Sequence, residues 1–399
     1  MAMRVAIAAP VDLPRLARLL DQSTEQTTPK GLGGPGTAAM VAELASRGHD
    51  VTLVTLSLEI DRPVHSRIGT VDVLTGPYRH RHRARDAFRR EREAVRTLLD
   101  SVDVDVVHAH WTYEFALGAL SGRHPALVTV RDWAPAILRH QPDAYRMVRL
   151  AMQGRCLAKA RHLTAVSPYI GDRLRRWCRG RTTVVPNGLP TSAFRLEPPR
   201  THQPVRHLLS VSSGFSKGKN TSALLRAFPA IRDELGDVEL TLIGGGHGPG
   251  GQAERWALSH GLADGVTFVG AMPAEQVLAA MDTADVFVAP TLEESFGMTV
   301  LEAMARGLPV VAGRSSGAVP WLLDLGRAGE LVDVRRPKSI SQGVVRLAKN
   351  ADLRAQLSQQ ALARARLFAW PNVVPAYEAE YEQVARRASA LRVLPGQPN

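Results

Sequence analysis

The stretch ADVFVAPTLEESFGMTVLEAMARGLPVVA, residues 284–312, decides the fold of this chain. Its first part, 284–290, is an apolar run closed by a proline, which predicts a buried strand. Residues 301–306 then predict a short helix that Gly307 ends, and 309–312 predict the next strand. A strand, a turn, a helix and a second strand make one α/β unit, and the free N–H groups at such a helix start favour an anion.

Two carboxylates flank the predicted start of this helix. Glu294 stands before it and Glu302 inside it, with seven residues between them. A lone Glu is most often a solvated surface acid, and that interpretation applies to each of the two on its own. Together with the free N–H groups between them, the pair favours a site for a ligand that carries both hydroxyls and phosphate.

This stretch resembles the signature of the retaining glycosyltransferase family 4, a Glu, seven residues and a second Glu within a Leu-Glu-Ala-Met-Ala-x-Gly-Leu-Pro-Val-Val run. Every element of that run is present at 301–311, and other parts of the family pattern recur in order over most of the chain. The resemblance implies an α/β fold of the GT-B type, with two Rossmann-like, doubly wound parallel-sheet domains facing each other across a cleft. It also implies a hexosyltransferase that retains anomeric configuration and needs neither metal nor cofactor.

The resemblance assigns roles around the helix start. Glu302 is expected to accept hydrogen bonds from the ribose diol of the nucleotide. Glu294 is expected to act beside the transferred sugar as a catalytic residue, either by holding a sugar hydroxyl or by stabilising positive charge at the anomeric carbon. No dedicated base is required if the leaving phosphate takes the proton of the acceptor. The groups expected to bind the sugar hydroxyls or the distal phosphate are those of Phe296, Gly297, Met298 and Thr299.

The diphosphate of such a donor needs fixed positive charge, because charge develops on the leaving oxygen. The family supplies an Arg and a Lys from one loop; here Lys219 matches the lysine, with a catalytic role, and Ser213 occupies the arginine position. Whether Lys217 takes over the second charge stays open, since an exposed loop lysine is equally common. Gly33 and Gly34 resemble the turn where the backbone approaches the leaving phosphate, although a tight turn without a ligand is about as common.

Three residues are candidates for the acceptor side of the first domain. Arg131 stands at a strand end where the family often has a His that contacts the donor sugar, and an arginine could contact phosphate or an acidic sugar instead. Asp132 follows it, and His110 ends another predicted strand where it could face the cleft. His108 is more typical of strand-end packing. Asp-Val-Asp at 103–105 mimics a metal motif but starts a strand, so we expect no metal there.

Strands and helices are predicted to alternate along both halves of the chain, which indicates two α/β domains. The acceptor-binding domain is expected over 1–195 and the nucleotide-sugar domain over 206–370, with a proline-rich linker at 197–204. By the resemblance, a last helix within 371–399 crosses back to the first domain. The predicted strands are 4–9, 51–55, 71–74, 104–108, 126–130, 162–165, 182–185, 207–211, 239–243, 266–269, 286–289 and 309–312.

Length and composition are typical of a soluble two-domain protein. The 399 residues suit two domains of about 150 to 200 residues each. Cys156 and Cys178 lack metal-ligand spacing and fit a reducing compartment. The apolar run 5–9 is too short for a signal peptide, and no stretch reaches the roughly 18 apolar residues of a membrane span. We therefore expect a cytoplasmic protein, with any membrane contact peripheral.

The net charge of +12 is densest at 79–96, which holds eight arginines and two histidines against Asp86, Glu91 and Glu93. The simplest interpretation is a solvated helix with charge pairs. A second interpretation is a face for a phosphate-bearing acceptor or an anionic membrane leaflet. Phe88 is the one aromatic residue there, so stacking on single-stranded nucleic acid is not expected.

Other classes of protein compete with the glycosyltransferase interpretation. An NAD-type oxidoreductase would share the doubly wound halves, but no Gly-x-Gly-x-x-Gly follows a strand with an acidic residue about 20 positions on. A basic nucleic-acid-binding protein would explain the charge, but zinc ligand pairs and RNA-binding aromatic motifs are absent. Within the same fold, a glycoside phosphorylase that uses a free sugar phosphate is the nearest alternative.

The substrates stay open at this level. A UDP-sugar is the favoured donor on family frequency alone, with GDP-mannose second. The acceptor supplies a hydroxyl, and a glycan, a lipid-linked glycan and a small metabolite are all compatible with the family. Nucleic acid is not an expected partner.

Overall fold

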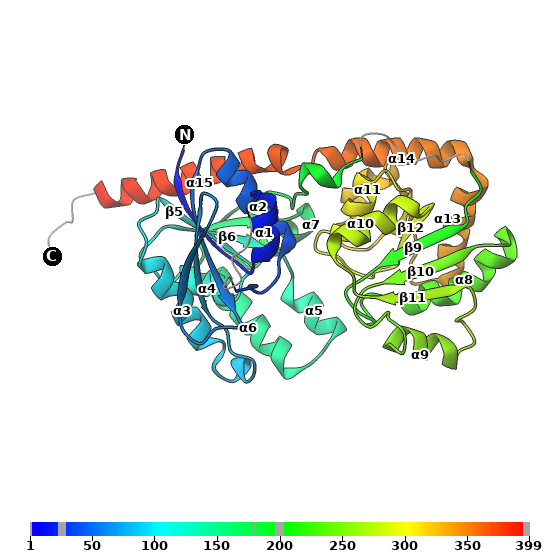
Figure 1. The fold of residues 1–399 in the computed structure, drawn as a ribbon, viewed down its shortest axis with the longest axis horizontal. Helices are drawn as coiled ribbons and strands as arrows, with labels where there is room; N and C mark the ends of the chain where they lie inside the picture. Colours follow the sequence, from blue (N-terminus) through cyan, green and yellow to red (C-terminus); the bar gives the residue numbers. More distant parts are fainter. Residues whose placement is uncertain (1, 23–28, 179, 196–202, 394–399) are drawn as a thin grey trace. The chain divides into compact units, whose positions relative to one another are not determined.

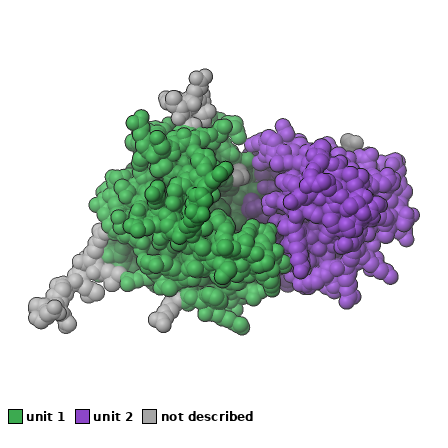
Figure 2. Space-filling model, turned by 90° about the horizontal axis from the view of Figure 1, so that it is seen from below, with its two compact units in different colours: residues 1–190, 370–399 green, residues 191–369 purple. Residues whose placement is uncertain are grey.

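The computed structural model describes residues 2–22, 29–178, 180–195 and 203–393. The chain divides into two compact units, which Figure 2 colours green and purple. Unit 1 is Met1–Pro190 with Trp370–Asn399, and unit 2 is Thr191–Ala369. Each unit is an α/β domain built on a largely parallel sheet, so the predicted fold class is confirmed.

Unit 1 contains an eight-stranded sheet (Figure 1). Its strands are β1 (Arg4–Ala8), β2 (Asp50–Ser57), β3 (Val64–Ile68), β4 (Val71–Pro77), β5 (Val106–His110), β6 (Ala126–Val130), β7 (His162–Ala165) and β8 (Arg181–Val184). They lie in the order β3-β4-β2-β1-β5-β6-β7-β8, and only the β3–β4 pair is antiparallel. The expectation of a fully parallel sheet is therefore wrong at one edge. The sequence pattern missed β3 because it exposes His65 and Arg67 and fully buries only Ile68.

Helices complete unit 1, and the last of them comes from the C-terminal end of the chain. They are α1 (Leu13–Leu19), α2 (Pro35–Ser46), α3 (Arg89–Asp100), α4 (Glu114–Ala119), α5 (Ala134–His140), α6 (Ala144–Lys159), α7 (Pro168–Leu174) and α15 (Trp370–Val393), with a 3₁₀ turn η1 (Arg83–Asp86). Trp370, Tyr377 and Tyr381 of α15 are at most 1% exposed and belong to the same core as β1 and α2. α15 also contacts β5 and β6, so it is an integral part of unit 1.

Unit 2 contains a six-stranded sheet in which all pairs run parallel. Its strands, in the spatial order β11-β10-β9-β12-β13-β14, are β9 (His207–Val211), β10 (Glu239–Ile243), β11 (Val266–Gly270), β12 (Val286–Ala289), β13 (Val310–Gly313) and β14 (Glu330–Val332). Its helices are α8 (Thr221–Leu235), α9 (Gln252–Ser259), α10 (Ala274–Thr283), α11 (Met298–Ala305), α12 (Val319–Leu322), α13 (Pro337–Lys349) and α14 (Ala351–Arg366), with 3₁₀ turns η2 (Thr191–Ala193) and η3 (Asp324–Gly326). Within the described parts of the chain, no helix has both the length and the apolar character needed to cross a membrane.

The predicted site residues lie at the carboxyl ends of strands in both sheets. In unit 1, His110 ends β5 and Arg131 follows β6. In unit 2, Lys219 follows β9 and Glu294 follows β12. Ligands of open α/β sheets bind outside these strand ends, so the topology of each unit places the candidates at the edge suited to a site.

Candidate active site

Lys219 and Glu294 form an ion pair in unit 2, although 75 positions separate them in sequence. The Lys219 Nζ donates to Oε1 of Glu294 at 2.8 Å, and the two side chains are 28% and 21% exposed. The loop β9–α8 carries the lysine, the loop β12–α11 carries the glutamate, and β9 and β12 are neighbours in the sheet. The topology therefore joins a cation and a carboxylate that the sequence predicted as separate parts of one site.

Asn220 ties together the loops that hold this pair. Its Nδ2 donates to the carbonyl oxygen of Pro290 at 2.9 Å and to that of Val334 at 2.8 Å. These bonds connect the segments that follow β9, β12 and β14, so they limit the motion of Lys219 relative to Glu294. Sequence reasoning missed this role; the signal is an Asn before a helix, because Asn tolerates the left-handed backbone (φ 56°) found here.

Gly317 supports the backbone of Glu294. The two residues form an isolated parallel bridge, and the N–H of Ala318 donates to the carbonyl oxygen of Glu294 at 2.9 Å. A Cβ at Gly317 would lie 2.3 Å from that oxygen, and its φ is +64°, so glycine is required. The Ser-Ser-Gly turn at 315–317 was the sequence signal that could have identified it.

The helix α11 begins at the predicted turn. Gly297 has φ 98°, and Met298 is the first helical residue. Met298 and Thr299 are half-buried in the first turn, and Glu302 is half-buried one turn further along. The free N–H groups of this turn therefore lie in sequence between Glu294, which pairs with Lys219, and Glu302. Free N–H groups of this kind are what a helix start offers to an anion.

Three other predicted donor-site residues have different surroundings. Phe296 is 3% exposed, and its ring centroid lies 6.1 Å from that of Trp321 and 5.9 Å from that of Phe368. Its side chain therefore belongs to the core, so only its backbone is available to a donor. Ser213 and Lys217 are exposed. The structure thus joins Lys219 to Glu294 and leaves Lys217 at the surface of the same loop.

The glycine turn of unit 1 starts α2. Gly33 and Gly34 have φ values of 80° and 94°, and Gly34 precedes the first residue of the helix. A Cβ at Gly34 would lie 2.3 Å from the carbonyl oxygen of Pro10, whereas a Cβ at Gly33 would meet nothing within 4 Å. Gly34 is thus needed for close backbone packing, and the open space beside Gly33 is compatible with a ligand.

Arg131 links the carboxyl ends of β5 and β6 to the segment after β8. Its Nε and Nη2 donate to Nδ1 of His110 at 2.9 and 2.8 Å, and its Nη1 donates to Oδ1 of Asn187 at 2.6 Å. His110 is fully buried, so the expectation that its side chain faces a cleft is wrong. Packing against His108, with ring centroids 4.0 Å apart, covers it, and burial lowers the pKa of His110 well below its usual range. His110 therefore acts on Arg131 as a neutral acceptor.

His108 connects this arginine to α15. It is fully buried, as predicted, with Nδ1 2.7 Å from the Tyr381 hydroxyl and Nε2 2.6 Å from Oγ1 of Thr129. Burial lowers the pKa of His108 well below its usual range, so the ring stays neutral in this network. The C-terminal helix thereby supports the side chains at the end of β5.

Asp132 points toward a different partner from that of its neighbour Arg131. Its Oδ1 accepts from the Tyr113 hydroxyl at 2.9 Å, and Gln153 donates to its backbone oxygen at 3.2 Å. Burial raises the pKa of Asp132 to about 6, and the Tyr113 hydrogen bond and the Arg149 charge oppose that rise. Burial therefore makes the charged form of Asp132 less favourable than that of an exposed carboxyl group. Its role on the acceptor side stays a prediction.

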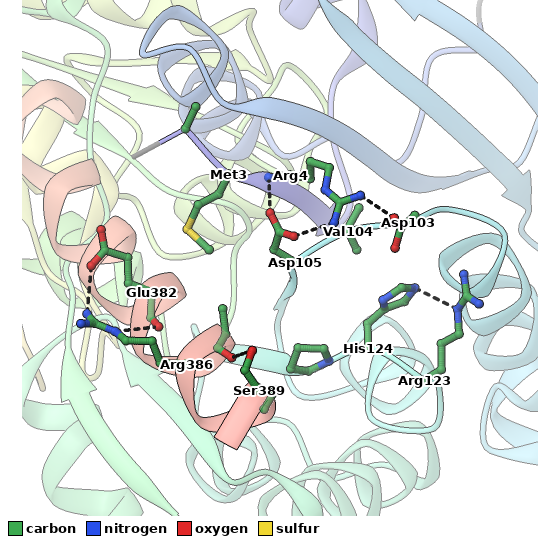
Figure 3. A pocket seen from close by; sticks show the side chains of 14 residues that line it. Met3, Arg4, Asp103, Val104, Asp105, Arg123, His124, Glu382, Arg386 and Ser389 are labelled. Carbon is green, nitrogen blue, oxygen red and sulfur yellow. Dashed lines mark hydrogen bonds and ion pairs between the residues drawn. The ribbon is translucent and has the colours of Figure 1, made fainter. Parts of the chain in front are cut away.

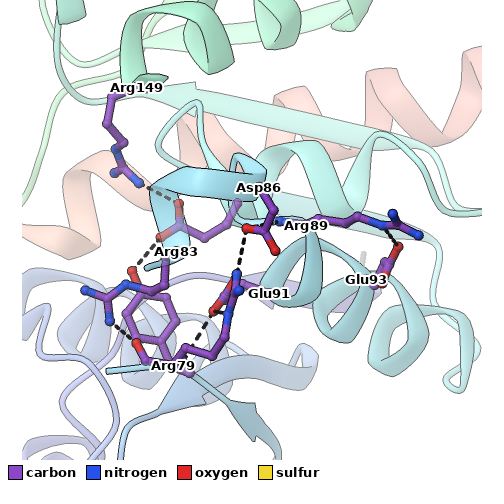
Figure 4. Close-up of polar contacts among 9 residues, drawn as sticks. Arg79, Arg83, Asp86, Arg89, Glu91, Glu93 and Arg149 are labelled. Carbon is purple, nitrogen blue, oxygen red and sulfur yellow. Dashed lines mark hydrogen bonds and ion pairs between the residues drawn. The ribbon is translucent and has the colours of Figure 1, made fainter. Parts of the chain in front are cut away.

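The arginine-rich segment 79–96 is not one solvated helix, so that expectation is wrong in its first half. The helix α3 starts only at Arg89, after left-handed residues that include Phe88, whose side chain is fully buried. Arg79 pairs with Asp86 at 2.8 Å and with the buried Glu91 at 2.7 Å (Figure 4). A buried aromatic anchor and a buried carboxylate thus fold the segment back on itself. Contact of its exposed arginines with an acceptor or a membrane stays a prediction.

A cavity of about 590 Å³ lies at the opposite edge of the unit 1 sheet, where β1, β5 and β6 begin beside α15 (Figure 3). Asp103 and Asp105 line it and form ion pairs with Arg4, the latter at 2.7 Å. The Asp-Val-Asp motif therefore lies at the amino-terminal strand edge, as predicted, and both of its carboxylates pair with one arginine, Arg4. This cavity is separate from the strand ends that carry the candidate residues.

Comparisons with known proteins match both units. The family model described as "Glycosyl transferases group 1" matches residues 200–364, and the one described as "Glycosyltransferase Family 4" matches residues 36–193. A D-inositol 3-phosphate glycosyltransferase of Corynebacterium jeikeium is 33% identical over 172 residues, which are 42% of this chain and 41% of the relative. A phosphatidyl-myo-inositol mannosyltransferase of Mycobacterium leprae is 29% identical over 231 residues, 56% of this chain and 60% of the relative.

The chain thus spans about half the length of these curated relatives. Among solved structures, a sucrose-phosphate synthase from Thermosynechococcus elongatus has a TM-score of 0.73 at 20% identity. The match covers 98% of this chain and all of the other. At that identity the likeness shows the fold, which is GT-B.

Proposed function

The chain belongs to glycosyltransferase family 4, and on that premise we propose that it transfers a hexosyl group from a nucleoside diphosphate sugar to a hydroxyl of an acceptor. It is a glycosyltransferase with the GT-B fold. The observation that carries the finer proposal is the ion pair between Lys219 and Glu294 at the carboxyl edge of the unit 2 sheet. This pair joins a cation that precedes α8 to a carboxylate that precedes α11.

The two residues of the pair can each stabilise one of the two charges that develop during the transfer. As the bond from the anomeric carbon to the phosphate oxygen breaks, negative charge develops on the leaving diphosphate, and Lys219 stabilises it. Glu294 holds Lys219 in place and stabilises the positive charge at the anomeric carbon. The acceptor oxygen forms the new bond with retained configuration, and its proton passes to the leaving phosphate. Lys219 and the N–H groups of α11 balance the diphosphate charge, so we expect transfer without a metal ion.

Glu302 is proposed to hold the nucleotide. A carboxylate can accept hydrogen bonds from both hydroxyls of a ribose, and Glu302 lies one helical turn beyond the anion-binding start of α11. A UDP-sugar remains the first donor to test. GDP-mannose is the second, and the mannosyltransferase among the relatives supports including it. The inositol groups in the relatives' names make a polyol or a lipid-linked polyol a reasonable first acceptor class.

The test is a titration of the wild-type protein with UDP, GDP, ADP and dTDP, each in EDTA and with added magnesium, followed by thermal shift and calorimetry. We expect one nucleotide to bind in EDTA and its sugar to be the donor. Lys219→Ala should weaken that nucleotide by about tenfold or more, since a hydrogen bond to a charged group is worth roughly 1.5–3 kcal/mol. Lys217→Ala, in the same loop but exposed, is the matched control and should change affinity little.

Each outcome bears on a different part of the proposal. Absence of binding by all four nucleotides would contradict a nucleotide-sugar donor. Equal losses in the two lysine variants would contradict the role of the ion pair. A strict need for magnesium would overturn metal independence alone, and breakdown of a glycoside that depends on free phosphate would favour a phosphorylase.

A further inference from the structure

The Arg131 guanidinium is held in one orientation by neutral groups. His110 Nδ1 accepts from two of its nitrogens, and Asn187 Oδ1 accepts from the third. Because Nδ1 is the acceptor, the neutral His110 ring carries its proton on Nε2 and supplies no negative charge. The Trp111 ring lies 5.2 Å from the guanidinium carbon, and it too is uncharged.

Arg131 lacks a counter-ion among the residues that the structure describes. The neighbouring carboxylate, Asp132, accepts a hydrogen bond from Tyr113 and does not form an ion pair with Arg131. The hydroxyls of Tyr377 and Tyr381 also act on Arg131, but burial raises the pKa of both phenols, so they are neutral at physiological pH and supply no counter-ion. The half-buried Arg149 of the same unit differs, since it lies 2.6 Å from a Glu114 oxygen.

A half-buried cation without an anion is costly, because desolvation of its charge is not compensated. Three of the five guanidinium N–H groups are occupied, which leaves one N–H on each terminal nitrogen. Two such N–H groups are what the oxygens of a carboxylate or a phosphate can bridge. The side chain is also preorganised, since its present bonds fix its plane before any ligand arrives.

We propose that a substrate bound at this edge of unit 1 carries a carboxylate or phosphate group, and that Arg131 is the residue that selects it. The word substrate here rests on the proposed function, whereas the anion site rests on the contacts of Arg131 alone. The anionic group belongs either to the transferred sugar or to the acceptor. The two sources share one chemistry and are separated by experiment.

The experiment compares matched ligands that differ by one anionic group. UDP-glucuronic acid against UDP-glucose tests the donor sugar, and glucose 6-phosphate against glucose tests the acceptor side, with affinities from calorimetry. We expect the anionic member of one pair to bind about tenfold tighter or more to the wild type. Arg131→Gln should bring that ratio close to one and leave UDP affinity unchanged. Arg90→Gln removes an exposed arginine and should keep the ratio.

A wild-type protein that binds the neutral and anionic members of both pairs equally would overturn the inference. So would an Arg131→Gln variant that loses affinity for both members of a pair by the same factor, because that pattern marks a structural role. Arg131→Lys, which keeps the charge and loses the planar fork, should give an intermediate ratio. If no nucleotide binds the wild type, the proposed function fails, and the glucose 6-phosphate pair and inorganic phosphate still decide the anion site.

Discussion

Single atoms decide the geometry of both candidate sites. The missing Cβ of Gly34 lets the start of α2 approach the Pro10 carbonyl, and the missing Cβ of Gly317 lets the backbone of Glu294 pair with it. The side-chain amide nitrogen of Asn220 joins the segments that follow β9, β12 and β14. At this scale, the uncharged residues Gly317 and Asn220 help to position the ion-paired Glu294 and Lys219.

Gly34→Ala should destabilise unit 1 much more than Gly33→Ala. Both glycines have left-handed φ, which costs an alanine roughly 1–2 kcal/mol, but only Gly34 adds a clash with backbone. The clash should add about 1–3 kcal/mol and lower the melting temperature by several degrees. Differential scanning calorimetry of the two variants measures this. Equal losses of stability in the two variants would show that the left-handed backbone of the turn, and not the close approach of Gly34 to Pro10, makes glycine necessary.

The helix α15 is the element on which the site of unit 1 depends. Its tyrosines bury the end of β5 and hold His108, which packs on His110. Next to Tyr377, Glu378 binds Arg47 through both oxygens, at 2.7 and 2.8 Å, and lies 2.9 Å from Nε2 of His49. The Arg47 hydrogen bond is the main reason that the pKa of Glu378 falls to about 2.

Glu378→Gln should destabilise the protein at neutral pH and matter little in acid. The folded state holds this carboxylate below its unfolded pKa of 4.5, so its contribution is complete above pH 4.5 and is lost as pH falls toward 2. The partly exposed pair should be worth about 1–2 kcal/mol at pH 7 after solvent screening. Urea denaturation from pH 7 to pH 3.5 measures the difference in the free energy of unfolding between wild type and variant. This difference should become smaller below pH 4.5.

Glu382→Gln is the control for this prediction. Glu382 lies one turn along α15 and pairs with Arg386 at 2.9 Å, but both side chains are exposed, at 43% and 72%. Exposed pairs four residues apart on a helix contribute about 0.3–0.5 kcal/mol, so this variant should stay close to wild type at all pH values. A difference for Glu378→Gln that does not change with pH would contradict the assignment of its effect to charge.

At the scale of the whole molecule, the order of the segments in sequence differs from their grouping into units. Unit 1 takes its last helix from beyond unit 2, so it is complete only when residues from both ends of the chain meet. Unit 2 is continuous in sequence. The two units therefore differ in what a truncation removes.

A chain that ends at Ala369 should leave unit 1 unfolded and unit 2 folded. It removes six side chains that are at most 3% exposed in the unit 1 core: Trp370, Val373, Val374, Tyr377, Tyr381 and Val384. At about 1.5–3 kcal/mol each, their burial matches the roughly 5–15 kcal/mol by which a domain is stable. Hydrogen exchange should show protection lost in unit 1 and kept in unit 2, with a chain ending at Val393 as the control. Equal protection in both units would contradict this account.

The sequence by itself determined the α/β class, the family, and the order in which most strands and helices follow one another. Those features depend on local patterns: apolar runs, glycine stops, and a motif of two Glu residues around one helix start. The short strands β3 and β14 escaped because three to five residues with partial burial carry little pattern. The turn before α3 was not predicted, because it depends on the burial of Phe88 and Glu91, which the local sequence pattern does not indicate.

Only the tertiary structure decided which of the candidate residues meet. Lys219 reaches Glu294 because β9 and β12 are neighbours in the sheet, and strand order is not written in any local pattern. In the same way, Arg131 binds His110 and Asn187 across three strand ends, while Asp132 pairs with Tyr113. A residue type and its spacing predict the chemistry of which a side chain is capable. Its partners and its charge balance depend on contacts between segments that are distant in sequence.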